Sequence, residues 1–84
     1  MICRIAELQF KELVDIGNGT KYGYISDLEI DIELGSIKNI VVYGRPRFLG
    51  ILGRAPDLVL PWSAIKRVGS DLILVDTAPL KKSE

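Results

Sequence analysis

The sequence predicts an all-β fold, specifically a small and mostly antiparallel β-barrel of about six strands. Hydrophobic and acidic residues alternate with a period of two across residues 27–34, which indicates a half-buried strand. An Asn-Gly pair at positions 18–19 separates two hydrophobic runs and is a strong hairpin signal. Because no helical pattern is long enough to cover a sheet, short strands must hide their apolar face by curling the sheet on itself.

The expected strands follow one another through tight turns. A first hairpin joins KELVDI to KYGYI through residues 17–20, and a second joins SDLEIDIEL to IKNIVVYG through residues 34–36. Three further short strands are expected in DLVLPW, IKRVG and DLILVD. Pro61 has no N–H to donate to a ladder, so it should end its strand and leave residues 62–64 as a tight turn or a single helical turn.

Both ends of the chain are expected to contribute little to the sheet. AELQFKELV fits a helix face as well as a strand, and we read a short helical turn at residues 6–9 followed by a strand. An 84-residue chain has room for one domain with one small core. We expect that domain to span residues 1–76 and residues 77–84 to form a frayed tail.

The acidic strand is expected to have one dry and one wet face. The dry face would comprise Leu28, Ile30, Ile32 and Leu34, and the wet face Asp27, Glu29, Asp31 and Glu33. The first three acids also match alternate positions of a calcium-binding loop, but Ile32 replaces its glycine and Lys38 replaces its bidentate glutamate. The alternation therefore indicates a solvated strand face.

The composition argues against an enzyme. The chain has no histidine and one cysteine, which excludes the usual Cys/His zinc sites and the commonest general base. GNGTKYG has the wrong spacing for a dinucleotide fingerprint. We therefore expect no catalytic residue, no cofactor and no metal. No apolar run is long enough to span a membrane and the N-terminus lacks a secretory signal, so we expect a cytoplasmic protein without a transmembrane segment.

Charge is divided unevenly along a chain whose formal net charge is zero. Residues 1–43 carry seven acids and four bases, whereas residues 44–84 carry seven bases and four acids. If this division persists after folding, the surface is dipolar. Such a surface can orient a partner or a second copy of the chain.

The segment GRPRFLGILGR, residues 44–54, is the candidate partner-binding site. It is too apolar for an ordinary loop and too rich in glycine for an ordinary strand or helix. Its predicted contact residues are Arg45, Arg47, Phe48, Leu49, Ile51, Leu52 and Arg54. Two interpretations stay open: the apolar side chains plug an open end of the barrel, or they stay exposed within a rim of arginines as a docking surface.

Four stretches of the chain carry a family resemblance. They are IAELQFKELVDI, GYISDLEIDIELGSIKNIVV, RFLGILGR and LVLPWSAIKRVGSDLILVD. Together they resemble the YlmC/YmxH-type sporulation proteins, which are stand-alone members of the PRC-barrel group. The resemblance implies a barrel of about six strands and a link to endospore formation, and it implies no catalytic residues. Other PRC barrels dock proteins, which favours protein docking as the use of the fold.

Three hypotheses follow for the function. The first is a non-catalytic interaction module that docks a protein partner or itself through residues 45–54. The second is an RNA- or ribosome-associated adaptor that combines basic residues with aromatic stacking on Phe48 and Trp62. Its basic residues would be Arg45, Arg47, Arg54, Lys66 and Arg67. The third is peripheral contact with a membrane through the same segment.

Overall fold

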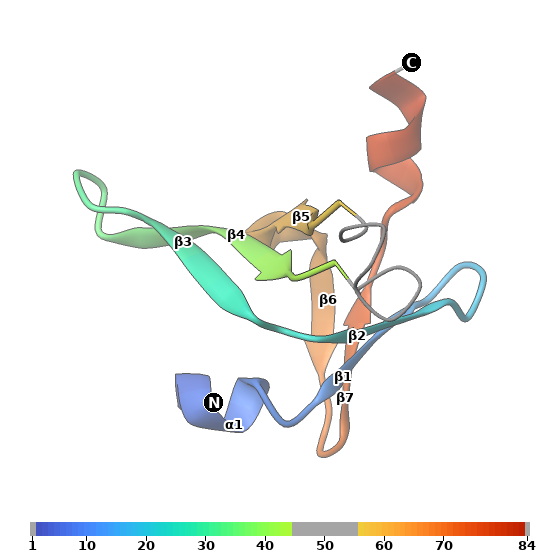
Figure 1. Ribbon diagram of the computed structural model, residues 1–84, viewed down its shortest axis with the longest axis horizontal. Helices are drawn as coiled ribbons and strands as arrows, with labels where there is room; N and C mark the ends of the chain where they lie inside the picture. Colours follow the sequence, from blue (N-terminus) through green and yellow to red (C-terminus); the bar gives the residue numbers. More distant parts are fainter. Residues whose placement is uncertain (1, 45–55, 84) are drawn as a thin grey trace, which may run out of the picture.

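Two small β-sheets pack against each other around one hydrophobic core (Figure 1). The computed structural model describes residues 2–44 and 56–83. The strands are β1 (Glu12–Asp15), β2 (Lys21–Tyr24), β3 (Asp27–Asp31), β4 (Ser36–Val42), β5 (Leu58–Pro61), β6 (Ile65–Val68) and β7 (Leu72–Val75). The helical segments are α1 (Ile5–Leu8) and the 3-10 helices η2 (Trp62–Ala64) and η3 (Ala78–Ser83).

The first sheet has the strand order β2-β1-β7-β6. Its two outer pairs are antiparallel hairpins, whereas its central pair, β1 and β7, is parallel, with Glu12 beside Leu72 and Asp15 beside Val75. Because β1 and β7 come from opposite ends of the sequence, their pairing closes nearly the whole chain into one unit. The turn between β1 and β2 uses Gly19 at a φ of 72°, as the Asn-Gly pair predicts.

The second sheet has the order β3-β4-β5 and is antiparallel throughout. The chain enters it directly from β2, and the Ser26 N–H donates to the Val41 carbonyl at 2.8 Å. The β3 and β4 hairpin is long and projects away from the rest of the molecule (Figure 1). Strand β4 alternates between exposed and half-buried residues over its first four positions and is buried over its last three.

The core lies between the sheets and is apolar. Leu13, Ile40, Ile73 and Val75 have no exposed surface. Along β1 and β7 the buried residues alternate with exposed or half-buried ones, so the first sheet has one inner and one outer face. The other core residues are Leu8, Ile25, Val42, Leu60 and Ala64.

The predicted all-β class is confirmed, as is the mostly antiparallel pairing. The structure has seven strands, and no ladder among the described residues joins the two sheets into a closed barrel. The helical turn expected at residues 6–9 is α1, and the single turn expected at residues 62–64 is η2. In residues 2–44 and 56–83, no helix is long and apolar enough to cross a membrane.

The prediction of a dry face along residues 28–34 is wrong for most of that segment. Leu28 packs against the core, but Ile30 is 56% exposed, Ile32 is 89% exposed and Leu34 is 78% exposed. Strand β3 ends at Asp31, so Ile32 and Leu34 belong to the turn. The core of so small a domain ends near Leu28, and the hairpin continues beyond it.

Residue 77, which the sequence assigns to a frayed tail, is part of the packed structure. Thr77 is 6% exposed, and its hydroxyl donates a hydrogen bond to the buried Asp15 carboxylate of β1. The 3-10 helix η3 follows it (Figure 1). A polar residue just after a strand gave no sign of this contact, because the partner carboxylate lies 62 positions away.

Candidate functional site

The predicted partner-binding residues Arg45, Arg47, Phe48, Leu49, Ile51, Leu52 and Arg54 lie outside the described residues. The structure does describe what holds the two ends of their segment. Val42 at the end of β4 pairs with Leu58 at the start of β5. The Gly44 N–H donates to the Asp57 carboxylate at 2.8 Å. The segment therefore connects two neighbouring strands at one end of the second sheet.

The two basic residues of β6 named in the RNA hypothesis differ in exposure from Trp62, the aromatic residue named with them. Lys66 and Arg67 are exposed, whereas Trp62 is half-buried and packs against the core. Trp62 therefore contributes to the interior, and the stacking role expected for it in the RNA hypothesis stays a prediction. Arg67 pairs across the ladder with Leu74, on the outer face of the first sheet.

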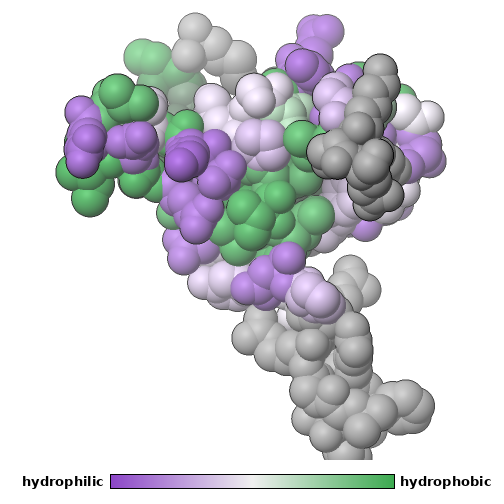
Figure 2. Space-filling view, turned by 90° about the horizontal axis from the view of Figure 1, so that it is seen from above, coloured by the Kyte–Doolittle hydropathy of each residue, from purple (hydrophilic) through white to green (hydrophobic). Residues whose placement is uncertain are grey.

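We define the β3–β4 arm as residues 27–38, the projecting part of the second sheet. At its end, hydrophobic and hydrophilic side chains lie next to one another (Figure 2, left). The large exposed apolar side chains are Ile30, Ile32 and Leu34. The charged side chains are Asp27, Glu29, Asp31, Glu33 and Lys38. The arm thus combines an exposed apolar surface with an excess of three negative charges.

Local hydrogen bonds order the arm beyond Leu28, the residue through which it packs against the core. The Asp31 carboxylate accepts from the Leu34 N–H at 3.0 Å, and the Gly35 N–H donates to the Asp31 carbonyl at 2.8 Å. Gly35 has a φ of 67°, a left-handed conformation that glycine adopts at low cost. Across the strands, the Asn39 amide donates to Glu29 at 2.8 Å. The apolar side chains are therefore presented on a defined turn.

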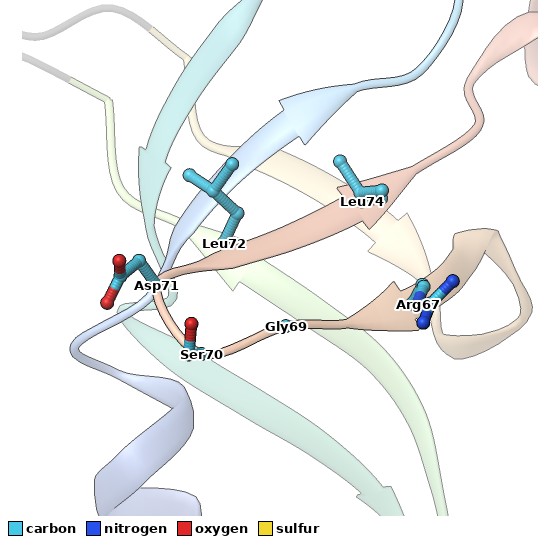
Figure 3. A pocket seen from close by; sticks show the side chains of 6 residues that line it. All are labelled: Arg67, Gly69, Ser70, Asp71, Leu72 and Leu74. Atoms are coloured by element: carbon cyan, nitrogen blue, oxygen red, sulfur yellow. The ribbon is translucent and has the colours of Figure 1, made fainter.

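A shallow groove lies on the outer face of the first sheet, and we call it the β7 groove. It has a volume of about 390 Å³. Leu72 and Leu74 point to the same side of β7, with Arg67 on the neighbouring strand and Ser70 and Asp71 at the turn (Figure 3). Ile73 and Val75, which alternate with these leucines along β7, are fully buried. The groove therefore lies on the face of the first sheet opposite to the core. Its floor is apolar and its rim is charged.

A third polar feature lies inside the molecule, around Asp15. This carboxylate is only 4% exposed. It accepts from the Thr77 hydroxyl, from the Tyr22 hydroxyl at 2.9 Å and from the Gly17 N–H at 2.7 Å. Each donor comes from a different part of the chain: the region after β7, strand β2, and the β1–β2 turn. The cluster therefore joins these parts to β1.

The hydrogen bonds to Asp15 stabilise its charged form. The Thr77 hydroxyl has the largest effect, followed by the Gly17 N–H, and together with weaker donors they lower the pKa of Asp15 from 3.8 to about 2. Burial raises the pKa of Tyr22, and the nearby Asp15 charge adds to that increase. Because donors of the same chain occupy its acceptor positions, the Asp15 carboxylate has the geometry of a structural group.

Sequence reasoning missed the arm, the groove and the Asp15 cluster. The arm has a signal that could have been used: eight alternating residues span about 26 Å as a strand, which is longer than the core of an 84-residue domain can cover on one face. The Asp15 cluster has only a weak local signal, an aspartate just before a glycine-rich turn. In the described part of the chain, no three acidic or cysteine side chains come together as possible metal ligands.

The fold and these surfaces define a small all-β domain with a filled core, an acidic arm and an apolar outer groove. Residues 3–81 match the sequence profile of the PRC-barrel domain, and the chain belongs to this family. It is 41% identical over 71 residues to the probable sporulation protein YlmC of Bacillus subtilis, which covers 84% of this chain and 88% of that protein.

Two further relatives are similar over most of their length. The uncharacterized protein YmxH of Bacillus subtilis is 33% identical over 75 residues, covering 87% of each chain. An uncharacterized protein of Clostridium acetobutylicum is 35% identical over 72 residues, covering 86% of this chain and 82% of the relative. The resemblance to sporulation-type PRC-barrel proteins is thereby confirmed.

Proposed function

We propose that this protein is a non-catalytic interaction module that acts in sporulation by docking a protein partner or a second copy of itself. One observation carries the proposal: the β3–β4 arm presents Ile32 and Leu34 almost fully to solvent on an ordered turn. Contiguous exposed apolar side chains with a polar rim are typical of protein interaction sites. The connection with sporulation rests on the similarity to YlmC, a probable sporulation protein.

In the isolated molecule, the arm leaves the side chains of Ile32 and Leu34 exposed to water. Exposing apolar surface to water is unfavourable by roughly 25 cal/mol per Å². Ile32 and Leu34 are not part of the core, and their turn could accept polar residues at the same positions. A partner that covers the arm recovers this free energy on binding. The arm is thus better suited to association than to stability.

The segment of residues 45–54 remains a proposed second contact, on the sequence alone. Its arginines and its apolar residues have the composition of an interface core with a charged rim. The structure supports the proposal only by showing that the segment joins the adjacent ends of β4 and β5.

The proposal is tested by affinity capture from sporulating cells with three tagged proteins. They are the wild type, an Ile32→Ser/Leu34→Ser variant of the arm, and a Phe48→Ser variant of the segment. We expect a ribonuclease-resistant protein, another species or the chain itself, to be captured by the wild type and lost with at least one variant. Val59→Ser, an exposed apolar position on β5 outside both regions, is the matched control and should capture as the wild type does.

Two outcomes would contradict this function. Complete loss of captured partners after ribonuclease treatment would favour an RNA-associated adaptor that uses the exposed Lys66 and Arg67. Equal capture by the wild type and both variants would place the contact on another face. Each variant must first show an unfolding transition like that of the wild type.

A further inference from the structure

We propose that the β7 groove binds the β3–β4 arm of a second copy of this chain. This inference rests on the proposed interaction function, for which it names one partner and both contact surfaces. It is carried by three independent matches between the arm and the groove: charge, apolar surface and unpaired strand edges.

The arm and strand β6, which borders the groove, carry opposite charges. The arm has four acids and one base, and Glu29 and Glu33 are both exposed. Strand β6, which borders the groove, carries the exposed bases Lys66 and Arg67 and no acid, whereas Asp71 and Glu12 lie beside the leucines of β7. Opposite charges across an interface accelerate encounter and orient the partners, and like charges disfavour the competing arm-to-arm contact.

The apolar parts of the two surfaces also match. The arm offers exposed Ile32 and Leu34 at its tip, and the groove offers Leu72 and Leu74 as its floor. Leu72 is 41% exposed and pairs with Glu12, whereas Leu74 pairs with Arg67. The leucine floor is therefore bordered by charged side chains, as interface cores usually are. Its volume of about 390 Å³ leaves room for large aliphatic side chains.

Both surfaces lie at the edge of a sheet. Strand β3 is the outer strand of the second sheet, and β6 is the outer strand of the first. Each pairs on one side only among the described residues, which leaves backbone groups on its other side for an added strand. An arm lying along β6 would place the acids of β3 beside Lys66 and Arg67.

The contact must form between copies, because the two surfaces of one chain point in different directions. The arm projects to the left in Figure 1, while the β6–β7 turn projects downward. Arm to groove is a contact between two different surfaces, so every copy can donate an arm and receive another. Such contacts build closed rings or longer assemblies, depending on the rotation between neighbouring copies.

The test uses two charge-reversal variants and their mixture. The arm variant is Glu29→Lys/Glu33→Lys, and the groove variant is Lys66→Glu/Arg67→Glu. We expect the wild type to associate as its concentration rises at low salt, and each variant alone to associate about tenfold or more weakly. Mixing the variants should restore association, because their charges are again opposite. Sedimentation velocity of the full chain measures all of these.

Matched controls reverse exposed charges outside both surfaces. Glu7→Lys in α1 replaces an acid by a base, as the arm variant does, and Lys21→Glu in β2 replaces a base by an acid, as the groove variant does. Both should associate as the wild type does. The Asn39 hydrogen bond to Glu29 is exposed, so the arm variant should keep its fold, which circular dichroism and the unfolding midpoint verify.

The inference is overturned if the wild type stays monomeric at every concentration, or if the mixed variants fail to associate. A monomeric wild type that still captures a ribonuclease-resistant partner through Ile32 and Leu34 would leave the proposed function standing with a different occupant. A chain that neither self-associates nor captures a protein would end both proposals.

Discussion

Asp15 shows how one buried carboxylate organises distant parts of a small chain. Its two oxygens accept from Thr77, Tyr22 and Gly17, and a side chain added at Gly17 would come within 3.2 Å of the carboxylate. A buried charge is tolerated when its acceptor positions are satisfied, and these donors meet that condition. The cluster therefore holds Thr77 against β1 and extends the packed structure past the last strand.

We predict that Thr77→Val destabilises the fold at neutral pH. Valine keeps the shape of threonine but removes the hydroxyl that donates to Asp15. Loss of a hydrogen bond to a charged buried group lowers the unfolding temperature of a domain this size by about 5 °C or more. Thermal unfolding followed by circular dichroism measures the change. Thr20→Val, at an exposed hydroxyl of the β1–β2 turn, is the control and should have little effect.

The same pair of proteins tests the pKa of Asp15. The folded-state pKa of about 2 lies below the ordinary value of 3.8, so between these values the unfolded chain binds more protons than the folded one. The stabilisation is therefore complete above pH 3.8 and is lost as the pH falls towards 2. Urea unfolding across this range should show the difference between wild type and Thr77→Val becoming smaller. A constant difference would mean that the hydroxyl does not act through the charge.

At the scale of elements, the β3–β4 arm is a hairpin that contacts the core through Leu28 and is stabilised beyond that residue by its turn and its ladder. Five register pairs join β3 to β4, with an irregularity between Glu29 and Ile30. Such an irregularity increases local twist and turns side chains away from the plane of the sheet. The alternating pattern correctly predicted the hairpin, but it did not show where the core ends, because alternation specifies two faces and not what covers them.

We predict that the arm tolerates substitution at its tip. Ile32→Ser/Leu34→Ser should change the free energy of unfolding by less than about 1 kcal/mol, because both side chains are exposed in the monomer. Ile73→Ala, at a fully buried position, should lower it by about 2–5 kcal/mol. Urea unfolding at a concentration where the chain is monomeric gives both values. A large loss from the tip variant would show that the arm packs in solution.

At the scale of the whole molecule, the parallel pair of β1 and β7 determines how the chain closes. Ile73 and Val75 enter the core from β7, and Leu13 enters it from the neighbouring β1. The two strands lie at the centre of their sheet, so their pairing is what joins the β1–β2 hairpin to the β6–β7 hairpin. Folding therefore requires nearly the full length of the chain.

We predict a sharp dependence of folding on where the chain is cut. A chain ending at Ser70 lacks β7 and should not fold, since the first sheet loses its central pairing and two fully buried side chains. A chain ending at Thr77 keeps the Asp15 hydrogen bond and should unfold cooperatively near the wild-type midpoint. Circular dichroism and urea unfolding compare them. A folded chain ending at Ser70 would show that β7 is dispensable.

Much of the fold could be predicted because its signals are local. Asn18-Gly19 requires a tight turn, Pro61 ends a ladder, and the alternation at residues 27–31 requires a strand. The candidate sites could not be predicted in the same way. Whether Leu72 is core or surface depends on which side of β7 faces the second sheet, and LILV contains no alternation of polarity that would decide it.

The sequence by itself determined the all-β class, the order of strands and turns, the family, and the division of charge between the two halves of the chain. These follow from turn chemistry, side-chain periodicity and composition, which act between neighbouring residues. Only the tertiary structure decided the parallel pairing of β1 with β7, the exposure of Ile32 and Leu34, and the burial of Asp15 against Thr77. These depend on contacts between residues far apart in the chain, whose free energies no local pattern records.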